Sequence, residues 1–472
     1  MGIVHLGLGA FHRAHQAVYT QLALAASEET SWGICGVTQR SPAVAEALRP
    51  QDCLYSVLVR RGKGTGVSVI GVIRDVLVAP EQPEMVTDRL AAPATRIAEL
   101  TVTEKGYRFD PSTGRLRSDD PELLADAQGR PPRTVIGQLV AGLEARRQRG
   151  SPSLTVLCCD NLPHNGDTLG RLVSEFCDLQ PGSQTNRLRS WMAENVSFPN
   201  TMVDRIVPAT TGADRSDVAA LLGLEDRGVV VTEPFSQWVI EDRFAGPRPA
   251  WERAGATLVG DVAPYEEMKL RLLNGSHSAL AYLGALAGFE LIADAVRAPE
   301  LARYIRAFMD LDVTPTLTVP PGFDLGSYKD ALMDRFADPA LRHRTIQVAM
   351  DGSQKLPYRL LRTISARLAA GEQPRRACLA VAGWMRFVSS GASDNGVPLG
   401  LDDPLAGRLR SVLATASSPT AIVSALLSLR EIFPADLAGD GTFRALLTEA
   451  LDALSRFGAA QAAGALGGEG SA

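Results

Sequence analysis

Short apolar runs recur through the first half of the chain, with helix-like stretches between them. Runs of this length, rich in β-branched residues, predict buried strands at 2–6, 33–37, 67–74, 97–103, 154–159 and 228–232. Several intervening stretches predict helices, among them 15–26, 43–48 and 134–149. Strands that alternate with helices are typical of a parallel sheet with helical crossovers, so we expect an α/β first domain.

The strand pattern stops near Pro264, and the chain becomes rich in Leu and Ala with helical periodicity. This pattern predicts helices at 265–286, 299–309, 328–336, 345–349, 357–370, 376–388 and 419–429. We therefore expect two domains, an α/β domain over 1–260 and an all-helical domain over 261–472. The Ala/Gly-rich end, 458–472, is predicted to be flexible.

Composition narrows the classes of partner. The 472 residues carry a net charge of −5, with 45% hydrophobic and 21% charged residues, which is ordinary for a globular protein. We expect no nucleic-acid surface and no membrane segment, because no basic face and no apolar run of about 20 residues occurs. The start shows no secretion signal, and the six cysteines have no disulfide spacing, so a cytoplasmic protein is expected.

The six histidines offer little support for a metal centre. Only His12 and His15 are close along the chain, and no third ligand follows them. We expect no metal site.

A glycine-containing turn follows the first predicted strand, in the segment Gly7-Leu-Gly-Ala-Phe-His-Arg13. Gly7 permits a tight turn, and Gly9 lets the backbone approach a pyrophosphate at the start of a helix. The usual third glycine is replaced by His12. Glycine pairs also occur in ordinary turns, but the position after the first strand favours a Rossmann-type, doubly wound fold. The predicted cofactor-binding residues of the turn are Gly7, Gly9, Ala10, Phe11, His12 and Arg13.

The sequence leaves the choice between NAD and NADP open. An acid at the end of the second strand commonly holds the adenosine ribose of NAD, and this chain has none there. Arg40 and Ser41 stand in its place and are suited to a 2′-phosphate, so NADP is not excluded.

The richest segment for catalysis is 264–278. At about 100° per residue, an α-helix places Glu266, Lys269, Asn274 and His277 on one broad face, beside leucines. Burial there lowers a lysine pKa and makes a neutral amine available as a base. The alternative interpretation is a surface Glu–Lys pair with Asn and His as hydrogen-bonded core residues.

Two predicted strands end in polar residues that would line the ligand-binding edge of a parallel sheet. Asn161 follows the strand at 154–159 and is suited to stabilise a developing alkoxide. The alternative is a simple turn, which Asn165-Gly166 commonly marks. Glu104 follows the strand at 97–103 and adds to the same rim.

Several long motifs, in order, resemble the mannitol dehydrogenase and fructuronate reductase family of long-chain, polyol-specific dehydrogenases. They run from residue 3 to about residue 390 and include Gly-Leu-Gly-Ala-Phe-His-Arg-Ala-His at 7–15, Thr-Glu-Lys-Gly-Tyr at 103–107, Cys-Asp-Asn-Leu-Pro at 159–163, Phe-Pro-Asn-Thr-Met-Val-Asp-Arg-Ile at 198–206, Glu-Pro-Phe-Ser-Gln-Trp-Val-Ile-Glu-Asp at 233–242, Lys-Leu-Arg-Leu-Leu-Asn-Gly-Ser-His at 269–277 and Met-Asp-Gly-Ser-Gln-Lys-Leu-Pro at 350–357.

The resemblance implies a role for each matched residue. It implies that Lys269 is the general acid/base, that Asn161 and Asn274 stabilise the reacting oxygen, and that His277 binds a neighbouring hydroxyl. It further implies that Glu266 and Asp204 carry the proton to water. The family needs no zinc, replaces the third glycine and is often monomeric, so we expect a zinc-independent monomer that uses NAD.

One departure bears on the substrate. Mannitol-type members resemble one another in an arginine eight residues before the lysine of the Asp-Gly-Ser motif, and this chain has Gln347 there while keeping Lys355. The run 342–355 is more similar to that of fructuronate reductases. Arg344 or Lys355 is suited to bind a substrate carboxylate, and the alternative for Arg344 is a solvated helix residue.

The leading hypothesis is reversible hydride transfer between NAD(H) and a sugar acid, fructuronate to mannonate, in a cleft between the domains. Oxidation of mannitol or arabinitol is the runner-up. A catalytically silent dinucleotide sensor on the same fold is the alternative from another class. The Lys-x4-Asn spacing also resembles 6-phosphogluconate-type dehydrogenases, but no clear basic phosphate-binding cluster accompanies it.

Overall fold

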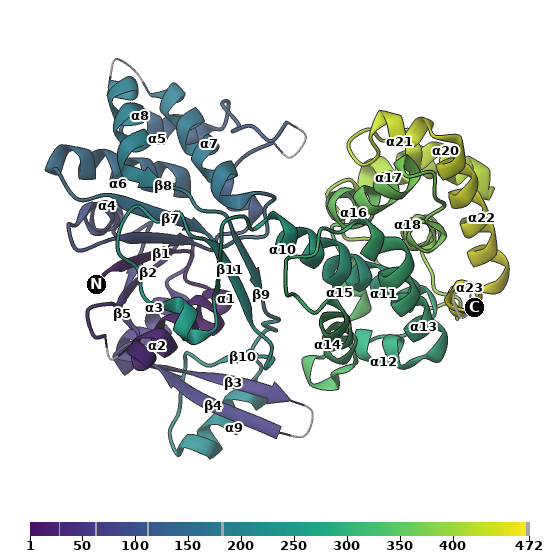
Figure 1. Cartoon of the computed structure of the whole chain (residues 1–472), viewed down its shortest axis with the longest axis horizontal. Helices are drawn as coiled ribbons and strands as arrows, with labels where there is room; N and C mark the ends of the chain where they lie inside the picture. Colours follow the sequence, from purple (N-terminus) through teal and green to yellow (C-terminus); the bar gives the residue numbers. More distant parts are fainter. Residues whose placement is uncertain (28, 62–63, 111–112, 181–183, 469–472) are drawn as a thin grey trace. The chain divides into compact units, whose positions relative to one another are not determined.

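A six-stranded parallel sheet forms the centre of the first of two compact units. The computed structural model describes residues 1–27, 29–61, 64–110, 113–180 and 184–468, and the chain divides into Met1–Ala263 and Pro264–Ala472 (Figure 1). The strands are β1 (Ile3–Leu6), β2 (Ile34–Thr38), β5 (Ile73–Val78), β6 (Ile97–Leu100), β7 (Leu154–Cys158) and β8 (Val196–Ser197). Their order, β5-β2-β1-β6-β7-β8, is that of the doubly wound dinucleotide-binding fold, which confirms the predicted fold class.

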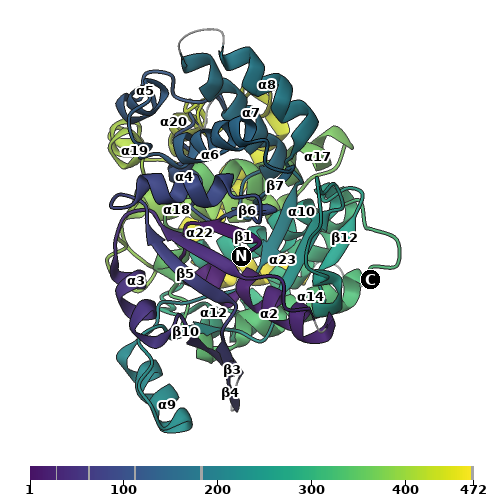
Figure 2. The same cartoon turned by 90° about the vertical axis from the view of Figure 1, so that its left-hand side faces the viewer.

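Helices cover both faces of this sheet, which explains why its strands are continuous apolar runs. In Figures 1 and 2, α4, α6 and α7 lie on one side of the sheet and α2 on the other. Residues of β1 enter two separate cores: Val4 and Leu6 pack with α4, α6 and α7, whereas Ile3 packs with α2 and the segments around Trp238. The helices of this unit are α1 (Ala10–Ala14), α2 (Gln16–Ser27), α3 (Ala43–Leu48), α4 (Pro83–Ala91), α5 (Pro121–Ala127), α6 (Val135–Arg149), α7 (Asn165–Leu179), α8 (Gln184–Asn195) and α9 (Gly212–Leu222).

The first unit also contains two smaller sheets of three strands each. The strands β3 (Tyr55–Arg61) and β4 (Gly64–Ile70) pair antiparallel, and β10 (Val230–Thr232) joins β3 in parallel. The third sheet has the order β12-β11-β9, from Thr257–Val259, Gln237–Glu241 and Thr201–Asp204. The single strand predicted at 67–74 is wrong: it merges the end of β4 with the start of β5, because the β-branched run continues across Gly71.

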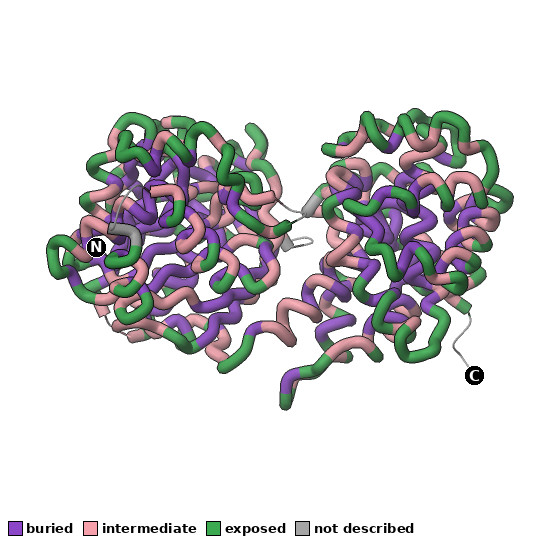
Figure 3. The backbone as a smooth tube through the Cα atoms, turned by 90° about the horizontal axis from the view of Figure 1, so that it is seen from above, coloured by how far each residue is buried: buried purple, intermediate pink, exposed green. Residues whose placement is uncertain are grey.

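The second unit is helical, with α11 (Gly275–Leu286) at its centre. All residues of α11 except His277 are buried, which fits a helix that is apolar on nearly every side, and α11 packs against α12, α13, α15 and α18. In Figure 3, buried segments gather on the inside of each unit and exposed segments on its outside. The other helices are α10 (Ala263–Met268), α12 (Ile292–Arg297), α13 (Pro299–Ala307), α14 (Leu325–Ala337), α15 (Thr345–Ala349), α16 (Gly352–Leu356), α17 (Arg362–Ala369), α18 (Arg375–Ser390), α19 (Ala406–Leu413), α20 (Pro419–Leu427), α21 (Ala435–Gly439), α22 (Gly441–Phe457) and α23 (Ala459–Gly467).

Three π-helical segments interrupt the helices that the sequence predicts as regular. They are η4 (Lys269–Asn274), η5 (Phe308–Val313) and η8 (Pro357–Leu361). The predicted helix 265–286 is therefore α10, η4 and α11 in succession. Such i→i+5 turns are rare and frequently mark functional sites.

Instead of a flexible end, most of the segment 458–472 forms α23. Its Ala459, Ala462 and Ala463 are buried, and Gly464 and Gly467 lie close to α13. Alanine is the strongest helix former, and small side chains let two helices approach closely, so the same composition that suggested fraying supports a packed helix here. Residues 469–472 lie outside the described part. Among the described residues, no helix combines the length and apolar character that a bilayer span requires.

Candidate active site

The glycine turn joins β1 to α1. Gly7 has a φ of +97°, and a Cβ atom there would lie 2.3 Å from the carbonyl oxygen of Thr101, so only glycine fits. The backbone amides of Gly7 and Leu8 donate to the carbonyl of Val37 at 2.9 and 3.0 Å. The turn is thus held between the ends of β2 and β6, the two neighbours of β1 in the sheet.

The residues of the turn divide into an accessible set and a buried set. Gly7, Gly9, Ala10 and Phe11 are half-buried, whereas His12 and Arg13 are buried. The Arg13 guanidinium donates to the carbonyls of Gly9 at 3.2 Å and Gly228 at 2.6 Å. Arg13 therefore braces the turn from behind, and the accessible residues offer backbone groups on which a pyrophosphate fits.

The ends of β6 and β7 are tied together by Asp160. Its half-buried carboxylate accepts hydrogen bonds from the amides of Val102 and Thr103, both at 2.9 Å, and from the Tyr107 hydroxyl at 2.6 Å. Thr103 has a φ of +67°, a strained conformation for a residue with a side chain. Burial raises the pKa of Asp160.

Two residues that the sequence predicts at the ligand-binding edge lie next to these hydrogen bonds of Asp160, and both are exposed. Asn161 follows Asp160, and Glu104 begins the short 3₁₀ turn Glu104–Tyr107. With Gly7, they follow the ends of three adjacent parallel strands, β1, β6 and β7, where ligands of doubly wound sheets bind.

Arg40 and Asp204 lie elsewhere in the first unit. Arg40 is exposed and follows β2, the strand that neighbours β1 in the sheet. The end of this strand is where the adenosine ribose of a dinucleotide is usually held. Asp204 is the buried last residue of β9, which belongs to the third sheet and pairs there with Gln237.

In the second unit, the chain segment α10–η4–α11 carries Glu266, Lys269, Asn274 and His277. The assumption of about 100° per residue is wrong here, because Lys269–Asn274 is a π-helix. An α-helix separates residues five apart by about 140° around its axis. In the i→i+5 turn the angle around the helix axis between Lys269 and Asn274 is smaller than in an α-helix, so the two side chains lie closer to one face. Lys269 is 7% exposed, and Asn274 and Glu266 are half-buried.

Close packing of two π segments supports this geometry. A Cβ atom at Gly275 would lie 2.9 Å from the carbonyl oxygen of Arg359, which belongs to η8. The amide of Gly275 donates to the carbonyl of Leu270, an i→i+5 bond. Glycine at 275 therefore allows η8 to lie directly against the end of the lysine-bearing turn.

His277 is held between two rings. Its centroid lies 5.4 Å from that of Phe336 and 5.3 Å from that of His343, each stacked at 26°. Burial lowers the pKa of His277 well below its usual value, and the neighbouring charges of His343, Arg359, Arg335 and Lys355 lower it further. The imidazole is therefore neutral, and it can either donate to or accept from a substrate hydroxyl.

The cationic groups around His277 are partly fixed by bonds of their own. Arg359 donates to the Ser278 hydroxyl at 3.1 Å, and the Lys355 ammonium donates to the carbonyls of Met350 at 2.5 Å and Val348 at 3.3 Å. Arg335 is buried on α14. These contacts fix two of the three positive side chains, Arg359 and Lys355, whose charges act on His277 together with that of Arg335.

Two other predicted substrate residues lie in a different setting. Arg344, at the start of α15, is exposed and pairs with Glu290 at 3.3 Å, and Gln347 of the same helix is exposed. Sequence reasoning did not single out Arg335, His343 or Arg359. Nothing in their spacing indicates the site, because Arg335 lies on α14, His343 lies just before α15 and Arg359 lies on η8. Only the folding of the helical unit brings these three segments to His277.

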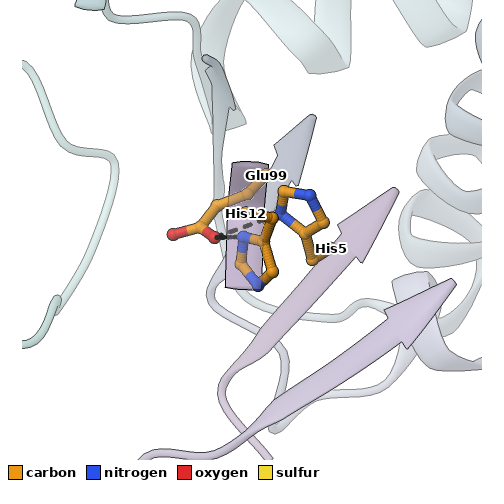
Figure 4. Close-up of side chains that lie close together, drawn as sticks. All are labelled: His5, His12 and Glu99. Atoms are coloured by element: carbon orange, nitrogen blue, oxygen red, sulfur yellow. Dashed lines mark hydrogen bonds and ion pairs between the residues drawn. The ribbon is translucent and has the colours of Figure 1, made fainter. Parts of the chain in front are cut away.

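The histidines cluster differently from the sequence-based expectation. His12 does not group with His15. It stacks on His5 at 3.4 Å between ring centroids, and both imidazoles face Glu99 (Figure 4). The expectation that no third ligand-type residue lies near is wrong, because pairing of β1 with β6 brings His5 opposite Glu99 across 94 positions. The candidate ligand atoms of the three side chains all lie within 4.8 Å of one another.

A dinucleotide turn in a doubly wound sheet, followed by a helical unit with a buried lysine, amide and neutral imidazole, defines a dehydrogenase that acts on CH–OH groups. Comparison with known proteins gives the family. A model of the mannitol dehydrogenase Rossmann domain matches residues 1–253, and one of the mannitol dehydrogenase C-terminal domain matches residues 261–455. The chain belongs to the mannitol dehydrogenase family, which confirms the resemblance.

Individual relatives cover nearly the whole chain. D-mannonate oxidoreductase of Escherichia coli (strain K12) is 42% identical over 98% of this chain and 95% of that protein. Mannitol 2-dehydrogenase of Pyrenophora tritici-repentis is 40% identical over 97% of this chain and 80% of that protein. The solved structure of Pseudomonas fluorescens mannitol 2-dehydrogenase, a ternary complex with NAD and D-mannitol, is 40% identical with a TM-score of 0.87, covering 99% of this chain and 94% of that one.

Proposed function

We propose that this enzyme is an NAD-dependent reductase of a ketose-type sugar acid, interconverting fructuronate and mannonate. The observation that carries the choice of substrate is the set of positive side chains, Arg335, Lys355 and Arg359, around His277. A polyol has no charge to offset theirs, whereas a carboxylate does, through charge-assisted hydrogen bonds. The 42% identity to a D-mannonate oxidoreductase supports the same choice.

The residues of the first unit fit NAD. Gly7 and Gly9 leave the backbone open where a pyrophosphate would bind, and the ends of β1 and β6 provide the usual dinucleotide edge. When bound, NADH supplies the hydride that reduces the ketone carbon. Ala10, Phe11, Arg40 and Glu104 are the further residues that we assign to cofactor binding.

In this proposal Lys269 acts as the general acid/base. During reduction its ammonium protonates the substrate oxygen, and during oxidation its amine accepts that proton. Asn161 and Asn274 donate side-chain hydrogen bonds to the same oxygen as it gains negative charge. The neutral imidazole of His277 binds the neighbouring hydroxyl, and Glu266 and Asp204 pass the proton on to water.

A substrate panel tests the proposal. Steady-state rates of the full chain with NADH should be measured on fructuronate, tagaturonate and fructose, and with NAD on mannonate, mannitol and arabinitol. We expect a uronate to give the highest kcat/KM. Activity on fructose and mannitol alone would overturn the sugar-acid choice. It would favour the polyol function, which the 40% identity to mannitol 2-dehydrogenases supports.

The same panel separates an enzyme from a sensor. NADH binding without turnover of any ketose or polyol would favour a catalytically silent dinucleotide sensor. We further propose that the enzyme works in the cytoplasm as a monomer on a small molecule, without nucleic-acid or membrane partners. The six buried cysteines, all free thiols, suit a reducing compartment.

A further inference from the structure

Two buried side chains and one half-buried side chain behind the glycine turn form a chain of hydrogen bonds that the proposed chemistry does not use. His5 of β1 and Glu99 of β6 are opposite each other in the sheet, and both are fully buried. His5 Nδ1 lies 3.3 Å from Glu99 Oε2, and His5 Nε2 lies 2.8 Å from the Thr101 hydroxyl. The Thr101 hydroxyl donates in turn to the carbonyl of Gly7 at 3.0 Å.

Counting hydrogens gives the direction of each bond. A hydroxyl has a single hydrogen, and that of Thr101 is used on Gly7, so Thr101 accepts from His5 Nε2. His5 Nε2 therefore carries a hydrogen. A second hydrogen must lie between His5 Nδ1 and Glu99 Oε2, because otherwise a lone pair would face a carboxylate in a site without solvent. The His5–Glu99 pair thus holds one additional proton and is neutral overall.

His12 packs its ring face on this pair. Its ring lies 3.4 Å from His5 at 23°, and its Nδ1 is 3.8 Å from Glu99 Oε2 (Figure 4). Burial, followed by the charges of His5, His15 and Arg13, lowers the pKa of His12 well below its usual value, so this ring is neutral.

We propose that Glu99, His5 and Thr101 are positioning residues for the cofactor: their chain of hydrogen bonds fixes the carbonyl of Gly7 and thereby the shape of the pyrophosphate-binding turn. The inference rests on the proposed use of NAD. Thr101 fixes Gly7 in two ways, because its own carbonyl excludes any side chain there and its hydroxyl holds the carbonyl of the turn. The cost of burying Glu99 and His5 is then offset by a turn that is preorganised for its ligand.

Thr101→Val tests this inference, with Thr95→Val as the matched control. Both threonines flank β6, and the buried Thr95 hydroxyl also donates to a backbone carbonyl, that of Arg89 at 2.7 Å, but at the opposite end of the strand. The Kd for NADH is measured by fluorescence titration of each full-length protein, and kcat is measured at saturating NADH. We expect Thr101→Val to raise the Kd about tenfold with kcat within about twofold, as the loss of one partly buried hydrogen bond implies. We expect Thr95→Val to leave the Kd unchanged.

The outcomes separate this inference from the proposed function. A wild-type protein that does not bind NADH contradicts the function itself. NADH binding that is equal in wild type and Thr101→Val overturns the positioning role, and so does an equal loss in both threonine variants, because that loss would be a general structural effect. Glu99→Gln is titrated with Zn²⁺ as a second check: stoichiometric zinc bound by the wild type and lost in this variant would show a metal site in place of the shared proton.

Discussion

At the scale of single residues, Lys269 is the side chain on which the proposed chemistry depends. It is buried at the start of a π-helical turn, and Asn274 closes the same turn. We expect Lys269→Ala to lower kcat by at least about a hundredfold, the low end for loss of a general acid/base. The Kd for NADH should change little, since the cofactor-binding turn belongs to the other unit.

Lys329→Met is the matched control for that variant. Lys329 is also a buried lysine of the helical unit, but its ammonium pairs with Asp310. Its loss should lower the melting temperature while kcat of the folded protein stays near that of the wild type. Near-normal turnover of Lys269→Ala would remove this lysine from its assigned role.

Arg335 provides the residue-scale test of substrate charge. It is buried on α14 and contributes positive charge to the surroundings of His277. We expect Arg335→Met to raise the KM for a uronate by about ten- to a hundredfold, because a hydrogen bond to a charged group contributes about 1.5–3 kcal/mol. The KM for any neutral ketose that the enzyme accepts should change much less.

The control for this variant is Arg376→Met. Arg376 is a buried arginine of α18 that pairs with Asp312 at 3.7 Å. It should lower stability without changing the ratio of uronate to ketose activity. If Arg335→Met weakens both substrates equally, the arginine acts through the packing of the unit and not through a substrate carboxylate.

Lys269 and Arg335 show which parts of the site could be predicted from the sequence and which could not. Lys269 belongs to a motif that is contiguous in the chain, so its neighbours Asn274 and His277 were identified with it. Arg335 comes from a separate helix that no motif links to His277. The pair of His5 and Glu99 was missed for a similar reason, because strand pairing and not spacing brings them together.

At the scale of elements, the strands of the main sheet were predictable because a parallel sheet buried on both faces makes each strand a continuous apolar run. The segments 2–6, 33–37 and 154–159 correspond to β1, β2 and β7 within one residue at either end. The turn at Gly71 and the π-helix at Lys269–Asn274 were not predictable from periodicity. A π turn depends on which groups pack beside it, and hydrophobic spacing does not record that.

Gly275 is the point where packing fixes the π geometry. A methyl group at this position would lie 2.9 Å from the backbone of η8, which cannot move as a side chain can. We expect Gly275→Ala to destabilise the protein by about 1–3 kcal/mol, the usual cost of overpacking. It should also lower kcat, since Asn274 and Lys269 would shift relative to each other.

Gly407→Ala is the control for this substitution. Gly407 lies in α19, where a Cβ atom meets nothing within 4 Å. An alanine there should leave the stability unchanged or raise it by about 0.5–1 kcal/mol, the difference in helix propensity. Thermal unfolding and steady-state kinetics of both variants decide the matter. Equal behaviour of the two would show that the approach of η8 to η4 has no structural consequence.

At the scale of the whole molecule, both units hold histidines in settings that keep them neutral: His12 is fully buried, and His277 and His343 are half-buried. Burial lowers the pKa of His12 in the first unit and of His277 and His343 in the second. The unfolded chain has no such burial, so its histidines titrate near their ordinary value of about 6.5. Below that pH the unfolded state binds protons that the folded state does not bind. Proton binding therefore favours the unfolded state, and the free energy of unfolding falls as the pH falls.

We therefore expect the contribution of these neutral histidines to the free energy of unfolding to be complete above about pH 7 and to decrease as the pH drops toward about 5. The fully buried His12 alone accounts for up to about 1.4 kcal/mol per pH unit in that window. Urea unfolding of the wild type at pH 7.5 and 5.5 measures the decrease, and His343→Asn should reduce it because one such histidine is gone. His164→Asn, at an exposed position, should leave it unchanged. A wild-type protein that is equally stable at both pH values would show that the buried imidazoles accept protons in the folded state.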